Sequence, residues 1–287
     1  MTRPVEVLRL DNIRKSFSSV NALKSASMTL REGEVVALLG DNGAGKSTLI
    51  KAISGVHPID GGTIYVRGEK VSIRSARDAM DLGIETIHQD TSLAPDLSIA
   101  RNLFLGREPV TLPFLGVFAP IDFGELRRSA SALLRRVGIS KALDADAPVS
   151  TLSGGERQSI AISRAMQFAA KVIILDEPTN NLGVEETYGV LRFVKEVRDA
   201  GHTVLFITHN IHHVFQVADR IVVMRRGEIV AERTVAGTDL LTIESLIMGV
   251  DVSTLAKDAK GALMTGPSMV SLQSRIASSD GREPAPW

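Results

Sequence analysis

Hydrophobic and polar positions follow three different patterns along the chain. Residues 5–10 mostly alternate and, with residues 26–30, predict strands in the N-terminal forty residues. Nearly continuous apolar runs predict buried strands of the kind found in parallel sheets: Val35–Leu39, Lys171–Leu175, Thr203–Thr208 and Ile221–Met224. From Ser98 to about Gly138 the apolar spacing is mostly helical. The patterns together predict an α/β protein with a separate helical piece.

Shorter signals complete the outline. Thr63–Val66 and Val71–Ile73 are predicted to form a hairpin. Ile84–Ile87 is predicted to be a strand that is followed by a loop at residues 88–90. A Pro- and Gly-rich segment, 109–120, interrupts the helical region. After about Val250 the periodicity is lost, which is typical of a mobile tail.

The stretch after the first apolar run predicts a phosphate-binding loop. It fits G-x-x-x-x-G-K-[ST] and lies between a predicted strand and a predicted helix, the context that the motif requires. Its glycines allow successive backbone N–H groups to converge on one phosphate. Lys46 would reach the β- and γ-phosphates, and the Ser47 hydroxyl would ligate Mg²⁺. The nine residues expected to bind nucleotide are Gly40, Asp41, Asn42, Gly43, Ala44, Gly45, Lys46, Ser47 and Thr48.

Two adjacent carboxylates follow the run that ends at Leu175. The carboxyl ends of parallel strands are where α/β sheets bind ligands. We expect Asp176 to hold Mg²⁺, directly or through water, and Glu177 to polarise a water beside the γ-phosphate. A solvated acidic turn is the alternative, and the phosphate loop in the same chain weighs against it.

A further helix is predicted to begin after Leu152. Ser153 and Glu156 have the spacing of a capping box, which on its own describes a well-capped helix. The paired Gly154 and Gly155 are not explained by capping, because glycine costs helix stability. Glycines at a helix N-terminus instead present free N–H groups to an anion.

Aromatic and histidine side chains add two candidates. Phe17 is the single aromatic residue before the phosphate loop; it could stack on a nucleotide base, and a core position fits it equally well. His209, at the end of a predicted strand, is expected to contact the γ-phosphate. A metal site made of His209, His212 and His213 is disfavoured, since no carboxylate or cysteine completes a spacing motif.

Composition narrows the class of protein. The 287 residues include 33 basic and 33 acidic residues, so no global positive field favours nucleic acid. The absence of cysteine excludes disulfides and cysteine-ligated zinc. No apolar core of a signal peptide follows Met1, and no apolar run approaches the length of a membrane span. We therefore expect a protein that is soluble or peripheral to a membrane.

In this order, the motifs resemble those of the ATP-binding subunits of ABC transporters. Phe17 stands at the adenine-stacking position, Gly40–Thr48 at Walker A, and Gln89 at the Q-loop. Leu152–Glu156 matches the signature and Val172–Glu177 matches Walker B, with His209 as the switch histidine. The resemblance covers roughly residues 5 to 245, and the signature together with Walker B is far more specific than either motif alone.

The resemblance implies a P-loop NTPase fold: a RecA-like core, an N-terminal antiparallel β subdomain and an inserted α-helical subdomain at about 95–160. Residues 1–245 would form the ATPase domain and 246–287 a tail. It also implies a head-to-tail pair of copies. Each ATP, with Mg²⁺, would lie between one copy's residues and the signature helix of the other. The first copy would supply Lys46, Ser47, Gln89, Asp176, Glu177 and His209, with Gln89 also beside the metal, and the second would supply Ser153, Gly154 and Gly155.

The sequence departs from the family's usual pattern at two positions. Phe17 replaces the more frequent tyrosine and keeps a π face for adenine. Gly183 stands where an acidic residue usually closes the D-loop.

A finer resemblance is to importers of monosaccharides such as ribose, xylose or fructose, carried by Gly40–Thr48, Ile50–Gly55, Asn102–Glu108 and Thr208–Asn210. It implies transmembrane permease subunits as partners, an extracytoplasmic binding protein acting indirectly, and a place on the cytoplasmic face of the inner membrane. The apolar loop Leu112–Ala119 is expected either to touch the permease or to pack locally.

Other classes fit less well. A soluble ABC ATPase acting on ribosomes or DNA usually has fused ATPase domains with a basic linker, or a long coiled coil. One phosphate loop, no sustained heptads and zero net charge argue against both. An exporter subunit stays open, since the permease decides direction. GTPase activity is disfavoured because no Asn-Lys-x-Asp motif follows the strands.

Overall fold

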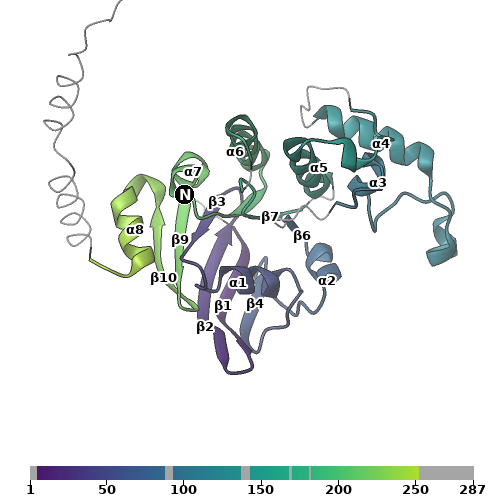
Figure 1. The fold of residues 1–287 in the computed structure, drawn as a ribbon. Coiled ribbons are helices and arrows are strands. Elements are labelled where there is room, and N and C mark those ends of the chain that lie inside the picture. Colours follow the sequence, from purple (N-terminus) through teal and green to yellow (C-terminus); the bar gives the residue numbers. More distant parts are fainter. Residues whose placement is uncertain (1–4, 88–92, 137–142, 168–169, 181, 252–287) are drawn as a thin grey trace, which may run out of the picture. The chain divides into compact units, whose positions relative to one another are not determined.

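The computed structural model describes residues 5–87, 93–136, 143–167, 170–180 and 182–251 (Figure 1). The chain divides into two compact units, one up to Thr238 and one from Asp239. The second unit contains helix α8, Leu240–Met248, so the boundary expected at residue 245 falls inside this helix. The other elements described below belong to the first unit.

A sheet of ten strands, in the order β5-β4-β1-β2-β10-β9-β3-β8-β7-β6, forms the frame of the first unit. Its parallel part contains β3 (Val35–Leu39), β6 (Ile84–Ile87), β7 (Val172–Asp176), β8 (Thr203–Ile207) and β9 (Arg220–Arg225). Strand β3 lies between β8 and β9 and is buried along its whole length. The continuous apolar runs of the sequence therefore mark the central strands, as expected for strands covered on both faces.

The antiparallel part is formed by β1 (Glu6–Phe17), β2 (Val20–Arg31), β4 (Gly61–Val66) and β5 (Glu69–Val71). The hairpin partner expected at Val71–Ile73 starts earlier, because a two-residue turn at Arg67 and Gly68 places Glu69 opposite Val66. Both turn residues have positive φ, 51° and 86°, which suits a tight hairpin turn. The structure thus has the antiparallel subdomain that the sequence predicted.

Helices cover both faces of the parallel part. Helix α1 (Lys46–Ile53) packs through Leu49, Ile50 and Ile53 into a core that also contains side chains of β1, β2 and β3. Helices α6 (Val184–Asp199) and α7 (Ile211–Val217) lie on the other face (Figure 1). Helix α2 (Ala76–Asp81) packs beside β6. This arrangement is the α/β P-loop NTPase fold expected from the sequence.

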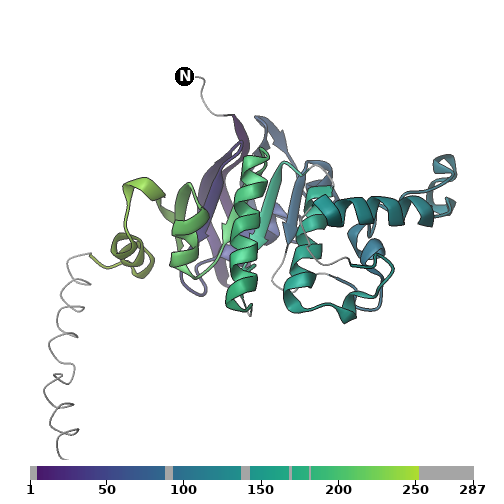
Figure 2. The same ribbon diagram turned by 90° about the horizontal axis from the view of Figure 1, so that it is seen from above.

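The helical region has a hydrophobic core of its own. It comprises α3 (Ile99–Leu103), the 3-10 turns Pro113–Phe118 and Val149–Thr151, α4 (Phe123–Arg136) and α5 (Gly154–Gln167). Ile99, Leu103, Leu126, Leu133 and Ile160 belong to that core. Figure 2 shows α4 extending away from the sheet. Helix α5 links this region to the sheet, since it also packs against β6.

Strand β10 (Glu228–Thr234), which the apolar pattern did not predict, joins the antiparallel and parallel parts. It pairs with β9 and, through Glu228 and Ser25, with β2. Its own residues are mostly exposed, so pairing with neighbours, rather than an apolar face, makes it a strand.

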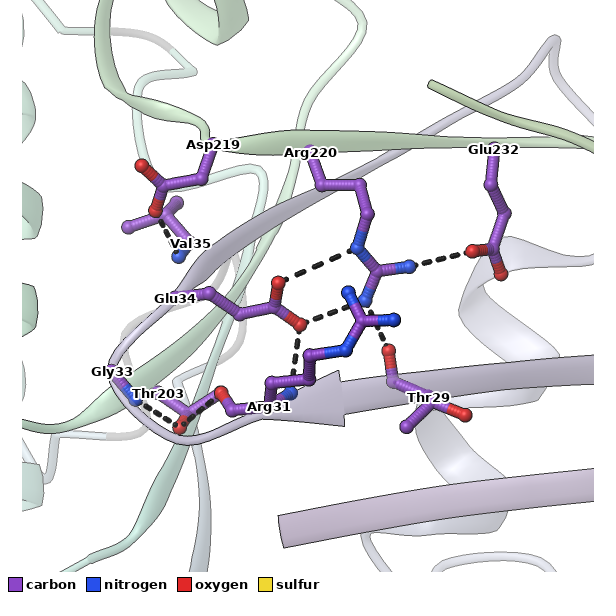
Figure 3. A network of polar contacts seen from close by, with 9 residues as sticks. All are labelled: Thr29, Arg31, Gly33, Glu34, Val35, Thr203, Asp219, Arg220 and Glu232. Carbon is purple, nitrogen blue, oxygen red and sulfur yellow. Dashed lines mark hydrogen bonds and ion pairs between the residues drawn. The ribbon is translucent and has the colours of Figure 1, made fainter. Parts of the chain in front are cut away.

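A buried arginine fixes this junction (Figure 3). The side chain of Arg220 is 8% exposed; its Nη2 lies 2.7 Å from Oε1 of Glu34, and its Nη1 lies 2.7 Å from Oε2 of Glu232. Nη2 also donates to the carbonyl oxygen of Thr29. Arg220 therefore links β9 to β10, to the end of β2 and to the turn before β3.

We expect Arg220→Ala to lower the free energy of unfolding by about 3 kcal/mol, because it leaves the carboxylate of Glu34, which is only 14% exposed, without its cation. Arg192→Ala is the control, since Arg192 pairs with Glu196 on the surface and such pairs contribute about 0.5 kcal/mol. Urea denaturation of both variants measures the difference. Equal losses would show that the network does not stabilise the junction.

Candidate functional site

The phosphate loop starts directly after β3 and ends at helix α1. A Cβ atom on Gly40 would lie 2.2 Å from the carbonyl oxygen of Met224, so glycine alone fits there. At Gly45, φ is 108° and a Cβ would lie 2.8 Å from the carbonyl oxygen of Ala22. Gly45 is also the N-cap of α1 and provides no side-chain cap, which leaves the first N–H groups of the helix available to an anion.

Lys46, the first residue of α1, bends back over the loop. Its Nζ donates to the carbonyl oxygens of Gly40, at 2.6 Å, and Asp41, at 3.1 Å. Burial lowers the pKa of the Lys46 ammonium, whereas the charges of Glu177, Asp41 and Asp176 act in the opposite direction. These contacts hold the only lysine of the loop above the residues that would cradle a phosphate.

Asp176 and Glu177 lie at the carboxyl end of β7, beside the end of β8. In the register of the two strands, Asp176 is opposite Ile207. Glu177 adopts a positive φ of 52°, an uncommon conformation for a residue other than glycine, and its N–H donates to the carbonyl oxygen of Ile207. Asp176 is thus the last residue of the strand, and Glu177 begins the turn that follows it.

His209, two residues beyond the end of β8, meets Glu177. Its Nδ1 lies 3.1 Å from Oε2 of Glu177, and the His209 side chain is 68% exposed while that of Glu177 is 16% exposed. The carboxylate is thus shielded by protein while the ring that contacts it faces solvent, which is where a ligand can approach.

One cleft of about 960 Å³ contains all of these groups. Its lining includes the whole of Gly40–Thr48 together with Asp176, Glu177 and His209. The structure therefore brings together the phosphate loop, both carboxylates and the histidine that the sequence singled out. The cleft is also lined by residues that the sequence analysis missed: Val20, Asn21, Ala22, Lys24, Asn180, Ile207, Arg226 and Gly227.

Two of the missed residues, Lys24 and Arg226, add positive charge to the cleft. They come from separate hairpins that meet here, since the N–H of Lys24 donates to the carbonyl oxygen of Gly227 and the N–H of Gly227 donates to that of Ala44. The position of Arg226 beside the phosphate loop follows from the parallel pairing of β9 with β3, in which Val223 lies opposite Leu39, and no local pattern signals this pairing.

Phe17 ends β1 and pairs with Val20 at the start of β2, close in the chain to the cleft lining. Its side chain is 41% exposed, so it is not a core residue. The ring meets His57 edge-on, with 5.1 Å between ring centroids, and Lys15 Nζ lies 5.5 Å from its centroid. Its role in base stacking stays a prediction.

The signature residues do not line the cleft in the part of the chain that is described. Ser153 and Glu156 form the expected capping box: Ser153 Oγ accepts from the N–H of Glu156 at 3.2 Å, and Glu156 Oε2 accepts from the N–H of Ser153 at 2.8 Å. Gly154 and Gly155 open α5. Gln89 lies outside the described residues.

Known proteins similar to this chain include a family model and several ATP-binding proteins of sugar importers. Residues 23–180 match the family model described as ABC transporter. The xylose/arabinose import ATP-binding protein of Sulfolobus acidocaldarius is 44% identical over 84% of this chain and 94% of its own length. The fructose import ATP-binding protein of Rhizobium meliloti is 43% identical over 77% of this chain and 85% of its own. The chain spans half the length of the galactofuranose transporter ATP-binding protein of Escherichia coli, at 39% identity over 89% of this chain.

Among solved structures, a dimeric ATP-binding cassette in a post-hydrolysis state, bound to ADP and phosphate, superposes with a TM-score of 0.67. It is 25% identical, and the match covers 80% of this chain and all of that one.

The chain belongs to the ABC transporter family. It is an ATP-binding subunit of that family, and such subunits hydrolyse ATP to power transport.

Proposed function

We propose that this chain powers the import of a monosaccharide through separate transmembrane permease subunits, and that it works as a head-to-tail pair of copies. The observation that carries the energy-supplying part of the proposal is the meeting of Glu177 and His209 in the same cleft as the phosphate loop. The names of the relatives, which import xylose, arabinose or fructose, support the class of substrate.

In the proposed site, the triphosphate of ATP lies on the N–H groups of Gly40–Thr48 and on Lys46. Glu177 orients and polarises the attacking water, and His209, at 3.1 Å from that carboxylate, contacts the γ-phosphate. Phe17 stacks on adenine, since its ring is partly exposed beside the start of β2. Gln89, which lies outside the described residues, is proposed from the sequence as the Q-loop residue beside the ATP and the metal.

Mg²⁺ fits this set of side chains. No group of three or more His, Cys, Asp or Glu side chains that could hold a metal occurs among the residues described. Mg²⁺ needs no such group, because it commonly takes one or two protein oxygens together with phosphate oxygens and water. Ser47 and Asp176, which line the same cleft, would supply the hydroxyl and the carboxylate. The ion would neutralise charge that develops on the phosphates.

The second copy is proposed because, among the residues described, the signature does not line the cleft of its own chain. Gly154 is exposed, and a Cβ there would meet nothing within 4 Å, so the described part of the chain gives no reason for glycine in the first turn of α5. A close approach by another molecule would give one. We propose that Ser153, Gly154 and Gly155 contact the ATP held by the other copy, and the dimeric cassette supports this.

The permease contact is proposed for the loop Leu112–Ala119. Phe114 and Phe118 are 81% and 85% exposed, and Leu112 and Leu115 are also exposed. Packing within the described chain therefore does not account for these side chains, and an apolar surface of this kind favours a protein partner. No helix in the described ranges is long and apolar enough to span a membrane. From the import ATP-binding relatives and the exposed apolar loop, we propose a peripheral subunit at the cytoplasmic face.

Uptake by reconstituted vesicles tests the proposal. We expect vesicles containing the permease subunits, this chain and the binding protein to accumulate one of xylose, arabinose, ribose or fructose when ATP is present on the side of this chain. The same vesicles with Phe114→Ser and Phe118→Ser should lose uptake while the purified chain keeps its basal hydrolysis. Outward movement of the sugar would indicate an exporter, and uptake that does not need ATP would contradict the proposal.

A further inference from the structure

A second histidine connects the same two loops as Glu177 and His209. His213, in the first turn of α7, places its Nδ1 3.2 Å from Oγ1 of Thr179, two residues after Glu177. Its Nε2 lies 3.2 Å from Nδ2 of Asn210, the residue after His209. Thr179 is buried, and His213 is partly buried. The imidazole ring of His213 thus lies between Thr179, two residues after Glu177, and Asn210, the residue after His209.

The contacts determine where the proton of His213 resides. Oδ1 of Asn210 accepts from the backbone N–H of His213 at 3.3 Å, so the amide nitrogen of Asn210 is the atom that faces Nε2. An amide nitrogen can only donate, so Nε2 must accept, and the proton of a neutral ring is then on Nδ1. Nδ1 therefore donates to Thr179 Oγ1. A second proton on Nε2 would place two donors against each other.

The surroundings favour the neutral ring. Burial lowers the pKa of His213, and the nearby His212 and His209 lower it further. His212 is exposed, and His209 contacts Glu177. The two loops are already adjacent, because β7 and β8 pair in parallel up to Asp176 and Ile207. The ring adds a side-chain link beyond the last backbone pair.

We propose that His213 is a positioning residue for ATP hydrolysis: by donating to Thr179 and accepting from Asn210, it fixes the distance between Glu177 and His209. The inference rests on the proposed role of Glu177 in catalysis. Without the link, the segment after Glu177 can move relative to the loop of His209, and the carboxylate spends less time in the geometry that activates water. The phosphate loop is not part of this linkage, so we expect it to hold the nucleotide as in the wild type.

A double-mutant cycle with His213→Ala and Thr179→Val tests the inference. Each single variant is expected to lower kcat about tenfold with KM for ATP within about twofold of the wild type. The double variant should lose no more than either single one, because both remove the same contact. His213→Asn, whose amide can donate from near the position of Nδ1, should recover kcat to within about threefold. If His213→Ala does not fold, Thr179→Val alone tests the same contact, because valine lacks the acceptor oxygen, and wild-type turnover in that variant would overturn the inference.

His212→Ala is the matched control, being adjacent and exposed, and should keep wild-type kcat. Losses that multiply in the double variant, a loss confined to KM, or wild-type turnover in His213→Ala would each overturn the inference. Glu177→Gln, measured alongside, separates the two proposals. If it is inactive while His213→Ala and Thr179→Val turn over normally, the positioning role alone is wrong; if it is active, the role of Glu177 is wrong as well.

Discussion

Glu177→Gln is expected to bind ATP as the wild type does and to hydrolyse it at least about a hundredfold more slowly. Glutamine has nearly the same shape, so the turn at Glu177 and the backbone hydrogen bond to Ile207 remain. The amide cannot accept a proton from water, and its contact with His209 Nδ1 becomes an uncharged one. Because ATP is bound and not consumed, two copies should accumulate as a dimer with nucleotide.

Phosphate release and equilibrium binding of ATP measure the two parts of this prediction. Glu196→Gln is the control, because Glu196 lies on the exposed face of α6 and pairs only with Arg192 among the ion pairs described. Wild-type turnover in Glu177→Gln would remove Glu177 as the group that activates water. Loss of ATP binding would instead mean that the carboxylate supports the site's structure.

Lys46→Ala is expected to weaken ATP binding about a hundredfold or more, because the phosphate loop loses its only cation. In the free protein the ammonium is held by the carbonyl oxygens of Gly40 and Asp41. Exchange of these neutral partners for a charged phosphate strengthens the hydrogen bonds of the ammonium. Alanine keeps helix α1, since it is the best helix former.

Lys51→Ala provides the comparison, because Lys51 lies in the last turn of the same helix and does not line the cleft. Isothermal titration with ATP should give wild-type affinity for Lys51→Ala and a strongly reduced affinity for Lys46→Ala. Equal affinity of the two variants would show that Lys46 does not contact the phosphates.

Residues with strong local signals were predictable from the sequence. The buried strands β3, β7 and β8 appear as continuous apolar runs because both of their faces are covered. The phosphate loop combines glycines, a lysine and a helix start within nine residues. The capping box at Ser153 and Glu156 is equally local, and its hydrogen bonds are present.

Features that depend on pairing between distant segments were not predictable. Strand β10 has mostly exposed residues and exists because a turn at Arg226 and Gly227 folds it onto β9. The pairing of β9 with β3, which is also between distant segments, carries Arg226 to the cleft. His213 was considered only as a metal ligand, because its contact with Thr179 spans 34 residues and requires two adjacent strands.

The steady-state rate of ATP hydrolysis as a function of the concentration of the purified chain tests most directly whether two copies build the site. If two copies build the site, the rate rises more than linearly with concentration and becomes proportional to it once the dimer is formed. Glu177→Gln should show no such rise. A rate strictly proportional to concentration at dilutions where the chain is shown to be monomeric would contradict the two-copy site, since one copy would then hold a complete site.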